Sequence, residues 1–283
     1  MGPINDMIGV EQGGVNSDKL YKLCNNIQLS TAESSGLGAV MGSTVLSSIG
    51  LADDTALLSN CFSKLSCLLH LTKEYCNNYH VELVPEKTKL LVFHPPNMSL
   101  QVYHQMFLSP LSLNGHRISQ STSAEHLGII RSPQGNMPNI VSRLSAHTRA
   151  IMTVLPTGMA FNHRGNPSAS LRLERLYGTP VLLSGLSSLV LSTSEASVVY
   201  HHYKLTLERL QRLHQATPET VVLFLASSLP CDAVLHLRMF SLLGMIARLG
   251  PSNVLHQHAR HVLFSPPTGS KSWFLSVRAL TQK

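Results

Sequence analysis

The chain has 283 residues, 43% of them hydrophobic, and carries a net charge of +7 at neutral pH. This length and apolar content are enough to build one large domain or two smaller ones. No apolar segment is long enough to predict a transmembrane helix and no signal peptide is evident, so we expect a cytoplasmic or nuclear protein. The odd number of cysteines, five, favours reduced thiols.

A glycine-rich segment near the start, residues 9–18, predicts a loop followed by a helix. Its glycines permit a tight turn, and the Asn, Ser and Asp that follow them are typical helix caps. Leu20, Leu23 and Ile27 recur at helical spacing and predict one apolar helix face. Taken alone, the loop is either a simple turn or a backbone segment that lets a nucleotide or a template strand approach closely.

The next segments predict a hairpin with two carboxylates at its tip. Residues 43–52 and 55–59 are rich in small, apolar and β-prone side chains, and Asp53 and Asp54 lie between them. Most Asp-Asp pairs are solvated turns. Here the strands would hold two acids together, where they repel each other unless a cation neutralises them. Hard oxygen ligands favour Mg²⁺ or Mn²⁺, so the hairpin predicts a metal site suited to phosphoryl transfer.

Downstream of the acids the sequence predicts a helix and several short strands. Apolar residues between 56 and about 80 recur at helical spacing. Residues 84–93 predict a lysine-bearing turn that leads into a strand. Residues 112–115 and 125–130 predict a short antiparallel pair around a loop. The expected order is therefore helix, acid-bearing hairpin, helix, strand and antiparallel pair.

The later sequence changes to consecutive helices broken by Gly and Pro. We expect three parts: mixed strands and helices at residues 1–133, a helical part at 134–264, and a polar tail at 265–283. Charge is also unevenly distributed, because residues 1–100 carry a net charge of −3 and residues 101–283 one of +10. The acid-bearing part therefore favours cations, and the remainder favours a polyanion.

Four short motifs follow one another in the first 130 residues. They are Gly-Val-Glu-Gln-Gly-Gly at 9–14, Leu-Ala-Asp-Asp at 51–54, Glu-Lys-Thr-Lys-Leu-Leu-Val-Phe at 86–93 and His-Leu-Gly-Ile at 126–129. In order and spacing they resemble motifs of a reverse transcriptase, and most closely that of non-LTR (LINE-type) retrotransposons. The resemblance implies an α+β fold: a partial polymerase palm, with an antiparallel sheet and packed helices, followed by an all-helical thumb and connector.

The resemblance also implies an activity and its catalytic residues. The activity is RNA-directed DNA polymerisation, with an RNA template, a DNA primer, deoxynucleoside triphosphates and no small-molecule organic cofactor. Asp53 and Asp54 would bind Mg²⁺ or Mn²⁺, with Asp53 the more direct ligand. Lys87 would lie near the departing pyrophosphate and donate a proton to it. The alternative for Lys87 is a solvated lysine in a turn.

Two further sets of residues would contact the substrates. The first lines the pocket for the incoming nucleotide and the template: Gln12, Gly13 and Gly14. The second matches the hairpin that grips the primer strand: His126, Leu127 and Gly128. For His126 a surface position on a strand is an equal alternative. Both assignments follow from the resemblance alone.

Basic residues after position 140 recur at helical spacing, which by default indicates solvated helix faces. Beside a polymerase palm they predict a thumb that contacts the phosphates of a template–primer duplex without base specificity. The arginines assigned to this role are Arg143, Arg149, Arg172 and Arg175. A further basic group consists of Lys204, Arg209 and Arg212.

The family's catalytic centre also needs a third carboxylate, on a palm strand upstream of the glutamine–glycine motif, and nucleotide-binding fingers. The chain starts eleven residues before Gln12, and Asp6 lies in the lead into the same loop. Two-metal transfer shares ligands between ions about 4 Å apart, so we expect an incomplete and inactive polymerase. Two alternatives stay open: a non-catalytic module that binds RNA or an RNA–DNA hybrid, and a functionless retroelement relic.

Overall fold

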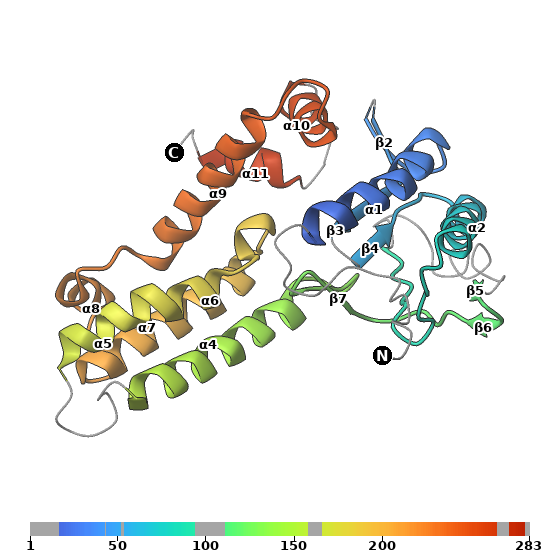
Figure 1. Ribbon diagram of the computed structural model, residues 1–283. Helices are drawn as coiled ribbons and strands as arrows, with labels where there is room; N and C mark the ends of the chain where they lie inside the picture. The colour runs from blue at the N-terminus through green and yellow to red at the C-terminus, as the bar shows by residue number, and fades with distance from the viewer. Residues whose placement is uncertain are drawn as a thin grey trace, which may run out of the picture. The chain divides into compact units, whose positions relative to one another are not determined.

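A computed structural model of the chain describes residues 17–42, 44–51, 54–93, 111–157, 166–264 and 272–280. They form a mixed α+β structure of short antiparallel hairpins and many helices (Figure 1). The expected α+β class is confirmed. The chain divides into two compact units, Met1–Ser121 and Thr122–Lys283.

In its described residues the first unit combines two helices with three two-stranded hairpins. Its elements are α1 (Ser17–Ser34), β1 (Ala39–Met41), β2 (Thr44–Leu46), β3 (Ser48–Leu51), β4 (Asp54–Leu57), α2 (Phe62–Asn78), β5 (Ser112–Leu113) and β6 (His116–Arg117). The hairpins are β1–β2, β3–β4 and β5–β6. Helix α1 packs on β3 and α2, and α2 packs on β4, so both expected helices lie against the acid-bearing hairpin. Helix α2 begins at Phe62 because residues 54–57 pair with β3.

Helix α1 packs by a different face from the one expected. Leu23 is 69% exposed and Ile27 46% exposed, whereas Gln28 and Ala32 are buried. Gly50 of β3 permits this packing, because a Cβ there would lie 3.2 Å from Cδ2 of Leu29 on α1. Leu23 and Ile27 are therefore largely solvent-facing, and α1 approaches β3 with Asn25 and Leu29 instead.

The strand expected after the lysine-bearing turn is reduced to a single bridge. Leu90 pairs in parallel with Gln120, and its side chain packs on a small core formed by Leu111, Leu113 and Ile118. The turn itself is present, since the Lys87 and Thr88 N–H groups donate to the Val84 carbonyl.

The antiparallel pair expected between residues 112–115 and 125–130 is wrong. Each segment instead closes a hairpin of its own: β5–β6 in the first unit, and β7 (Ala124–His126) with β8 (Ile129–Arg131) in the second. The physical reason is local turn chemistry. Asn114 and Gly115 have φ values of 51° and 82°, and Leu127 and Gly128 have 54° and 72°. Two successive positive φ angles make the tight turn that favours two-residue hairpins.

The second unit begins with β7 and β8 and continues as a series of helices. These are α4 (Met137–Thr157), α5 (Pro167–Leu173), the π-helix η1 (Glu174–Gly178), α6 (Thr179–Leu183), the 3-10 helix η2 (Leu186–Ser188), α7 (Thr193–Gln211), α8 (Glu219–Ala226), α9 (Cys231–Ala247), α10 (Val254–Phe264) and α11 (Trp273–Leu280). Their shared core is rich in leucine and draws on α4 to α9 and α11. The helical character expected of this part is therefore present.

The β7–β8 hairpin belongs to this helical unit and not to the acid-bearing one. The boundary between the two units therefore lies earlier in the chain than the expected residue 133. Strand β8 packs on α4, and the Ile130 N–H donates to Oδ1 of Asn139 at 3.1 Å. A Cβ on Gly185 would lie only 2.8 Å from Cγ1 of Ile129. The hairpin is thus held against α4 and the loop before η2.

The expected polar tail contains a buried helix, which corrects that assignment. In α11, Phe274 and Val277 are buried, and the Trp273 indole N–H donates to the Ser187 carbonyl at 2.7 Å. Residues 265–272, which precede the helix, are Ser, Pro, Thr, Gly and Lys, and this polar run hides the mainly apolar helix that follows it. The helix packs on α9 and α10 and so forms part of the helical unit.

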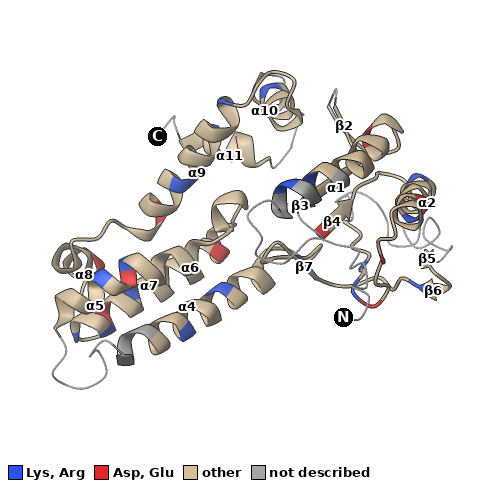
Figure 2. Ribbon diagram, viewed as in Figure 1, with Lys and Arg blue, Asp and Glu red and all other residues tan. Residues whose placement is uncertain are grey.

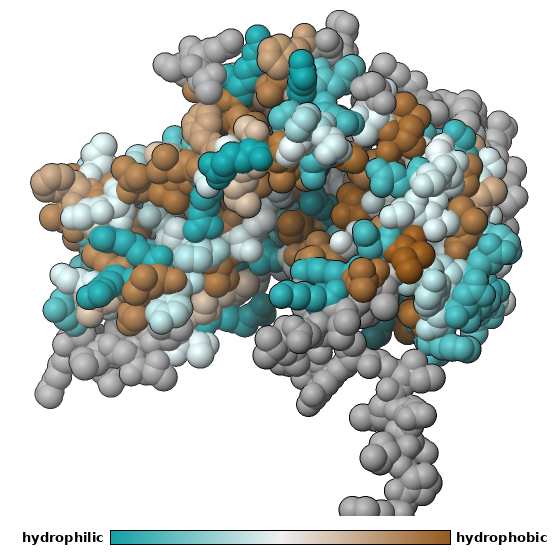
Figure 3. All heavy atoms as spheres, turned by 45° about the horizontal axis from the view of Figure 1, so that its top comes forward, coloured by the Kyte–Doolittle hydropathy of each residue, from teal (hydrophilic) through white to brown (hydrophobic). Residues whose placement is uncertain are grey.

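Apolar and polar side chains interleave over the face of the molecule shown in Figure 3. The largest exposed apolar residues include Phe224 of α8, at 81% exposure. Among the helices in the described ranges, none alone is long and apolar enough to cross a bilayer. Helices α8 and α9 together reach the required length and hydropathy, with a bend of 61° between them.

Candidate functional site

The acid-bearing hairpin forms as expected, with Asp54 at its end. The last pair of the β3–β4 ladder is Leu51–Asp54, and the Asp54 side chain is exposed. Asp53 lies outside the described residues. The structure thus gives one exposed carboxylate at the end of a short hairpin, supported by α1 and α2 on its strands.

An exposed carboxylate suits a hard divalent ion, because Mg²⁺ takes oxygen ligands and retains several waters. Within the described ranges, no three His, Cys, Asp or Glu side chains lie close enough to share a metal ion. Asp54 therefore offers one described oxygen-donor group that fits Mg²⁺ or Mn²⁺. A metal bound by Asp53 and Asp54 together stays a prediction.

Lys87 and the glycine-rich motif add little to the described site. Lys87 is exposed in its turn, and among the described residues no hydrogen bond or ion pair joins it to Asp54. The segment that holds Gln12, Gly13 and Gly14 lies outside the described residues. The roles expected for these residues stay predictions.

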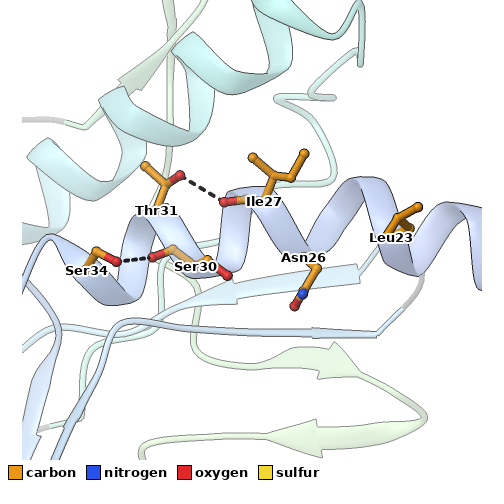
Figure 4. A pocket seen from close by; sticks show the side chains of 6 residues that line it. All are labelled: Leu23, Asn26, Ile27, Ser30, Thr31 and Ser34. Carbon is orange, nitrogen blue, oxygen red and sulfur yellow. Dashed lines mark hydrogen bonds between the residues drawn. The ribbon is translucent and has the colours of Figure 1, made fainter.

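A shallow depression of about 550 Å³ follows the exposed face of α1 (Figure 4). Its lining residues are Leu23, Asn26, Ile27, Ser30, Thr31 and Ser34. The Thr31 and Ser34 hydroxyls donate to the carbonyls of Ile27 and Ser30, at 2.8 and 2.7 Å. These hydroxyl protons are therefore used within the helix, and the depression presents mainly apolar atoms.

The structure brings two sets of expected nucleic-acid residues together, the β7–β8 turn and Arg143. A Cβ built on Gly128 would lie 3.7 Å from Nη2 of Arg143. Asn139, one turn earlier on α4, is fully buried and accepts the Ile130 N–H. Residues four apart lie on one helix face, so Asn139 and Arg143 both face the hairpin.

Three buried nitrogen atoms in this region have no hydrogen-bond partner among the residues that the structure describes: Nε2 of His126, Nδ2 of Asn139 and Nε of Arg143. We call His126, Asn139 and Arg143 the hairpin–α4 cluster. Leaving a buried polar group unpaired costs about 1–3 kcal/mol. Two of the three nitrogens are obligate donors, and His126 donates in one of its tautomers. Such a set of donors, one of them cationic, is suited to an anion.

The other arginines differ in exposure and in whether their guanidinium groups already donate hydrogen bonds within the protein. Arg149 and Arg172 are exposed on α4 and α5. The Arg175 guanidinium donates to the Ala226 carbonyl at the end of α8, so part of its donor capacity is used inside the protein. Lys204 pairs with the buried Glu208, with 3.2 Å between Nζ and Oε1. Figure 2 shows Lys and Arg on several helices of this unit, including α4 and α9.

Asn139 is the cluster member that the sequence did not identify. Asn139, Arg143 and His147 recur at every fourth residue of α4, a spacing that puts three polar side chains on one face. In a sequence this pattern is typical of a solvated face. Here it is buried, because β8 and α7 pack against α4.

Comparisons with models of protein families, with curated protein sequences and with solved structures found no match to this chain.

Proposed function

We propose that the chain is part of a LINE-type reverse transcriptase, a partial palm followed by a helical thumb, and that it binds nucleic acid through phosphates. The observation that carries the binding proposal is the hairpin–α4 cluster, which joins the His126 hairpin and Arg143 at one place. The reverse transcriptase assignment rests on the order and spacing of the four motifs. Both point to a polyanionic partner, an RNA–DNA hybrid.

The chemistry of the cluster suits a phosphate of the duplex backbone. Arg143 and His126 are half-buried, and Asn139 is fully buried. A guanidinium donates two parallel hydrogen bonds to a phosphate, and these charge-assisted bonds are about twice as strong as neutral ones. Asn139 holds the hairpin edge through Oδ1, while its Nδ2 is left to donate directly or through water.

The net charge of the helical unit supports the same partner. From Thr122 onward the sequence has fifteen Lys or Arg against six Asp or Glu. Such an excess attracts nucleic acid and releases its condensed counterions, so affinity falls as salt rises. Contacts of this kind position a duplex without reading its sequence. In the parent activity, Mg²⁺ held by Asp53 and Asp54 would supply Lewis-acid chemistry at the transferred phosphate.

The test is salt-titrated binding of a labelled 20-base-pair RNA–DNA hybrid to the full chain, read by fluorescence anisotropy. We expect the logarithm of the affinity to fall linearly with the logarithm of salt concentration. Arg143→Gln should weaken binding about tenfold and reduce the salt slope by about 1, the effect of one lost phosphate contact. An affinity that does not change with salt would contradict the proposal.

Arg260→Gln is the matched control, since it removes the same charge from an exposed residue of α10, which packs on α9 and α11. We expect it to weaken binding less than threefold. An equal loss in the two variants would show that the hybrid responds to the total charge of the unit, and it would refute a phosphate site at the cluster.

A further inference from the structure

A second buried polar array lies in the helical unit, away from any assigned role. His147 of α4 and Glu174 of η1 both have side chains that are 0% exposed, with 3.4 Å between Nε2 and Oε1. The other ring nitrogen of His147, Nδ1, lies 2.9 Å from Nε2 of His202 on α7. The Thr179 hydroxyl lies 2.8 and 3.0 Å from the two Glu174 oxygens. The array thus ties together α4, α7 and the π-helical turn.

The backbone around the array is shaped to accommodate it. Glu174 and Gly178 begin and end the single π-helical turn η1, a rare element that is often found at functional sites. A Cβ on Gly178 would lie 3.0 Å from Nε2 of His147 and 3.2 Å from Oε1 of Glu174. Glycine is therefore required here by close packing against the two side chains.

The geometry limits how many protons the two rings hold. One nitrogen of each ring takes part in the 2.9 Å contact, so one must donate and the other accept, and only one proton lies between them. A proton on both of these nitrogens would leave two N–H groups facing each other with no acceptor between them, and two fully protonated rings would add repulsion between two cations. The pair therefore carries at most one positive charge, which Glu174 balances through the second nitrogen of His147.

A shared metal ion is a poorer explanation of the same residues. The two nitrogens of His147 face different partners, so one ion could not bind His147, His202 and Glu174 at once. This agrees with the lack of a cluster of three potential metal ligands among the residues that the structure describes.

The charges around His202 all oppose its protonation. Burial, and then the charges of His147 on α4 and of Arg209 and His201 on α7, lower the pKa of His202 from 6.5 to about 4. None of the groups that act on it is a carboxylate, and Glu174 reaches it only through His147. Around the array, burial and then the charge of Glu174 raise the pKa of Tyr203 on α7. Burial and the charges of Asp232 and Glu174 likewise raise the pKa of Cys231 on α9.

We propose that the His202–His147–Glu174 array is an acid-sensitive latch, in which a second proton on the two imidazoles breaks the contact between α4 and α7 and loosens the helical unit. The inference stands on the array itself and does not depend on nucleic-acid binding. Because His202 binds protons more readily in the unfolded chain, stability is present above about pH 6.5 and is lost as the pH falls towards 4.

The test compares urea unfolding of the full chain at pH 7 and pH 5 with that of His202→Gln, using the fluorescence of the single tryptophan, Trp273. Glutamine keeps a hydrogen bond to His147 and does not titrate. Between pH 7 and pH 5 the unfolding constant of the wild type should rise roughly 20-fold more than that of His202→Gln. Parallel pH profiles of the two proteins would overturn the proposal.

His201→Gln is the matched control, because His201 is the exposed neighbour of His202 on the same helix. Its profile should follow the wild type within twofold, and loss of the pH effect in this variant would also overturn the latch. A second measurement uses the unmodified chain: ¹⁵N NMR titration of its histidine rings should show one ring that stays neutral to about pH 4. A folded chain in which every ring titrates near pH 6.5 would refute the proposal even if His202→Gln fails to fold.

Discussion

Gly178 shows how a single missing Cβ allows two buried ionisable side chains to meet. Its backbone is helical, with φ of −72°, so the residue is needed for space and not for an unusual conformation. A Cβ on this residue would lie 3.0 Å from Nε2 of His147 and 3.2 Å from Oε1 of Glu174, which is tighter than an ordinary contact, so the two side chains would have to shift. Gly178 thus leaves the space in which the side chains of His147 and Glu174 pack beside the π-helical turn.

Gly178→Ala should therefore destabilise the helical unit. Alanine gains about 1 kcal/mol of helix propensity over glycine, but overpacking a well-filled core costs about 1–3 kcal/mol, and here it also pushes His147 away from Glu174. We expect a net loss of about 1–2 kcal/mol in the free energy of urea unfolding.

Gly244→Ala provides the opposite outcome within the same unit. Gly244 lies inside α9, and the nearest atom to its Cβ would be Nη1 of Arg248 at 4.0 Å. This substitution should stabilise the chain by about 0.5–1 kcal/mol. Equal effects of the two alanines would contradict the packing argument for Gly178.

Leu127 carries backbone strain in the turn that was matched to a primer grip. Its φ of 54° is a left-handed conformation, which costs a leucine roughly 1–2 kcal/mol, and its side chain is 43% exposed. Leu127→Asn would give this turn the Asn-Gly dipeptide that the β5–β6 turn already has.

We expect Leu127→Asn to raise the unfolding free energy by about 1 kcal/mol, measured by urea denaturation. If the cluster binds phosphate as proposed, affinity for the hybrid should stay within twofold, since Arg143 and Asn139 are unchanged. A loss of stability would show that the exposed leucine makes a contact worth more than the strain.

At the scale of elements, the hairpins show what local sequence does and does not determine. The pattern at residues 43–59 predicts β3–β4 correctly, because two β-prone runs flank a short polar connection. At residues 112–131 the sequence pattern predicts that the two segments pair with each other. In the structure each segment instead contains its own two-residue turn with positive φ. Asn114-Gly115 signals such a turn plainly, whereas Leu127-Gly128 does not, since leucine rarely adopts this conformation.

Helix faces were less predictable than helix positions. Leu23 and Ile27 define the apolar side of α1 in the sequence, yet the helix packs where Gly50 lets Leu29 approach β3. Asn139 and His147 look solvent-facing by residue type, yet both are fully buried. In each case the partner surface decides which face is covered, and the partner lies far away in sequence.

The start of α7 joins two parts of the helical unit. The Ser192 hydroxyl and the Glu195 carboxylate form a reciprocal capping box. Glu195 also accepts from the Asn136 N–H, with 2.9 Å between Oε1 and N. Burial raises the pKa of Glu195, but the hydrogen bonds from Ser192 and Asn136 outweigh it and leave the pKa below its ordinary value of 4.5.

Glu195→Gln should cost about 1–2 kcal/mol of unfolding free energy at pH 7. Because the folded pKa is lowered, the carboxylate's contribution is present above the unfolded value of about 4.5 and is lost as the pH falls through the folded value. The difference between variant and wild type should thus shrink by pH 3. Glu125→Gln, an exposed strand residue, should change stability little at either pH, and a difference for Glu195→Gln that is the same at pH 7 and pH 3 would argue against the lowered pKa.

At the scale of the whole molecule, the two units differ in charge and in core. The first has nine Asp or Glu against seven Lys or Arg. Among its described residues, three buried apolar side chains form a small cluster around β5 and β6, and Ala32, Leu68 and Cys76 are buried outside that cluster. The second is strongly basic and has a large leucine-rich core. The difference in charge can be predicted from the sequence, because it depends only on which residues each part contains. The position of the β7–β8 hairpin cannot, because it depends on contacts with α4 and Gly185, which are distant in sequence.

The acid-bearing hairpin is relevant to whether the chain of residues 1–283 can synthesise DNA. The sequence supplies two adjacent carboxylates, Asp53 and Asp54, and two-ion phosphoryl transfer requires ligands shared around both ions. Two carboxylates next to each other in the chain would bind a single ion weakly, through water-rich contacts. We therefore expect no incorporation in a primer-extension assay with an oligo(dT) primer on poly(rA), with either Mg²⁺ or Mn²⁺, even where the hybrid binds.

Two variants make this last prediction decisive. Asp53→Ala and Asp54→Ala should leave hybrid affinity within twofold or raise it, since each removes a negative charge from the surface that would face phosphates. Incorporation by the wild-type chain that Asp53→Ala abolishes would show that the two acids suffice for catalysis and would overturn the expectation of inactivity. Binding that persists without incorporation would instead separate the phosphate binding proposed for the helical unit from the polymerase chemistry proposed for Asp53 and Asp54.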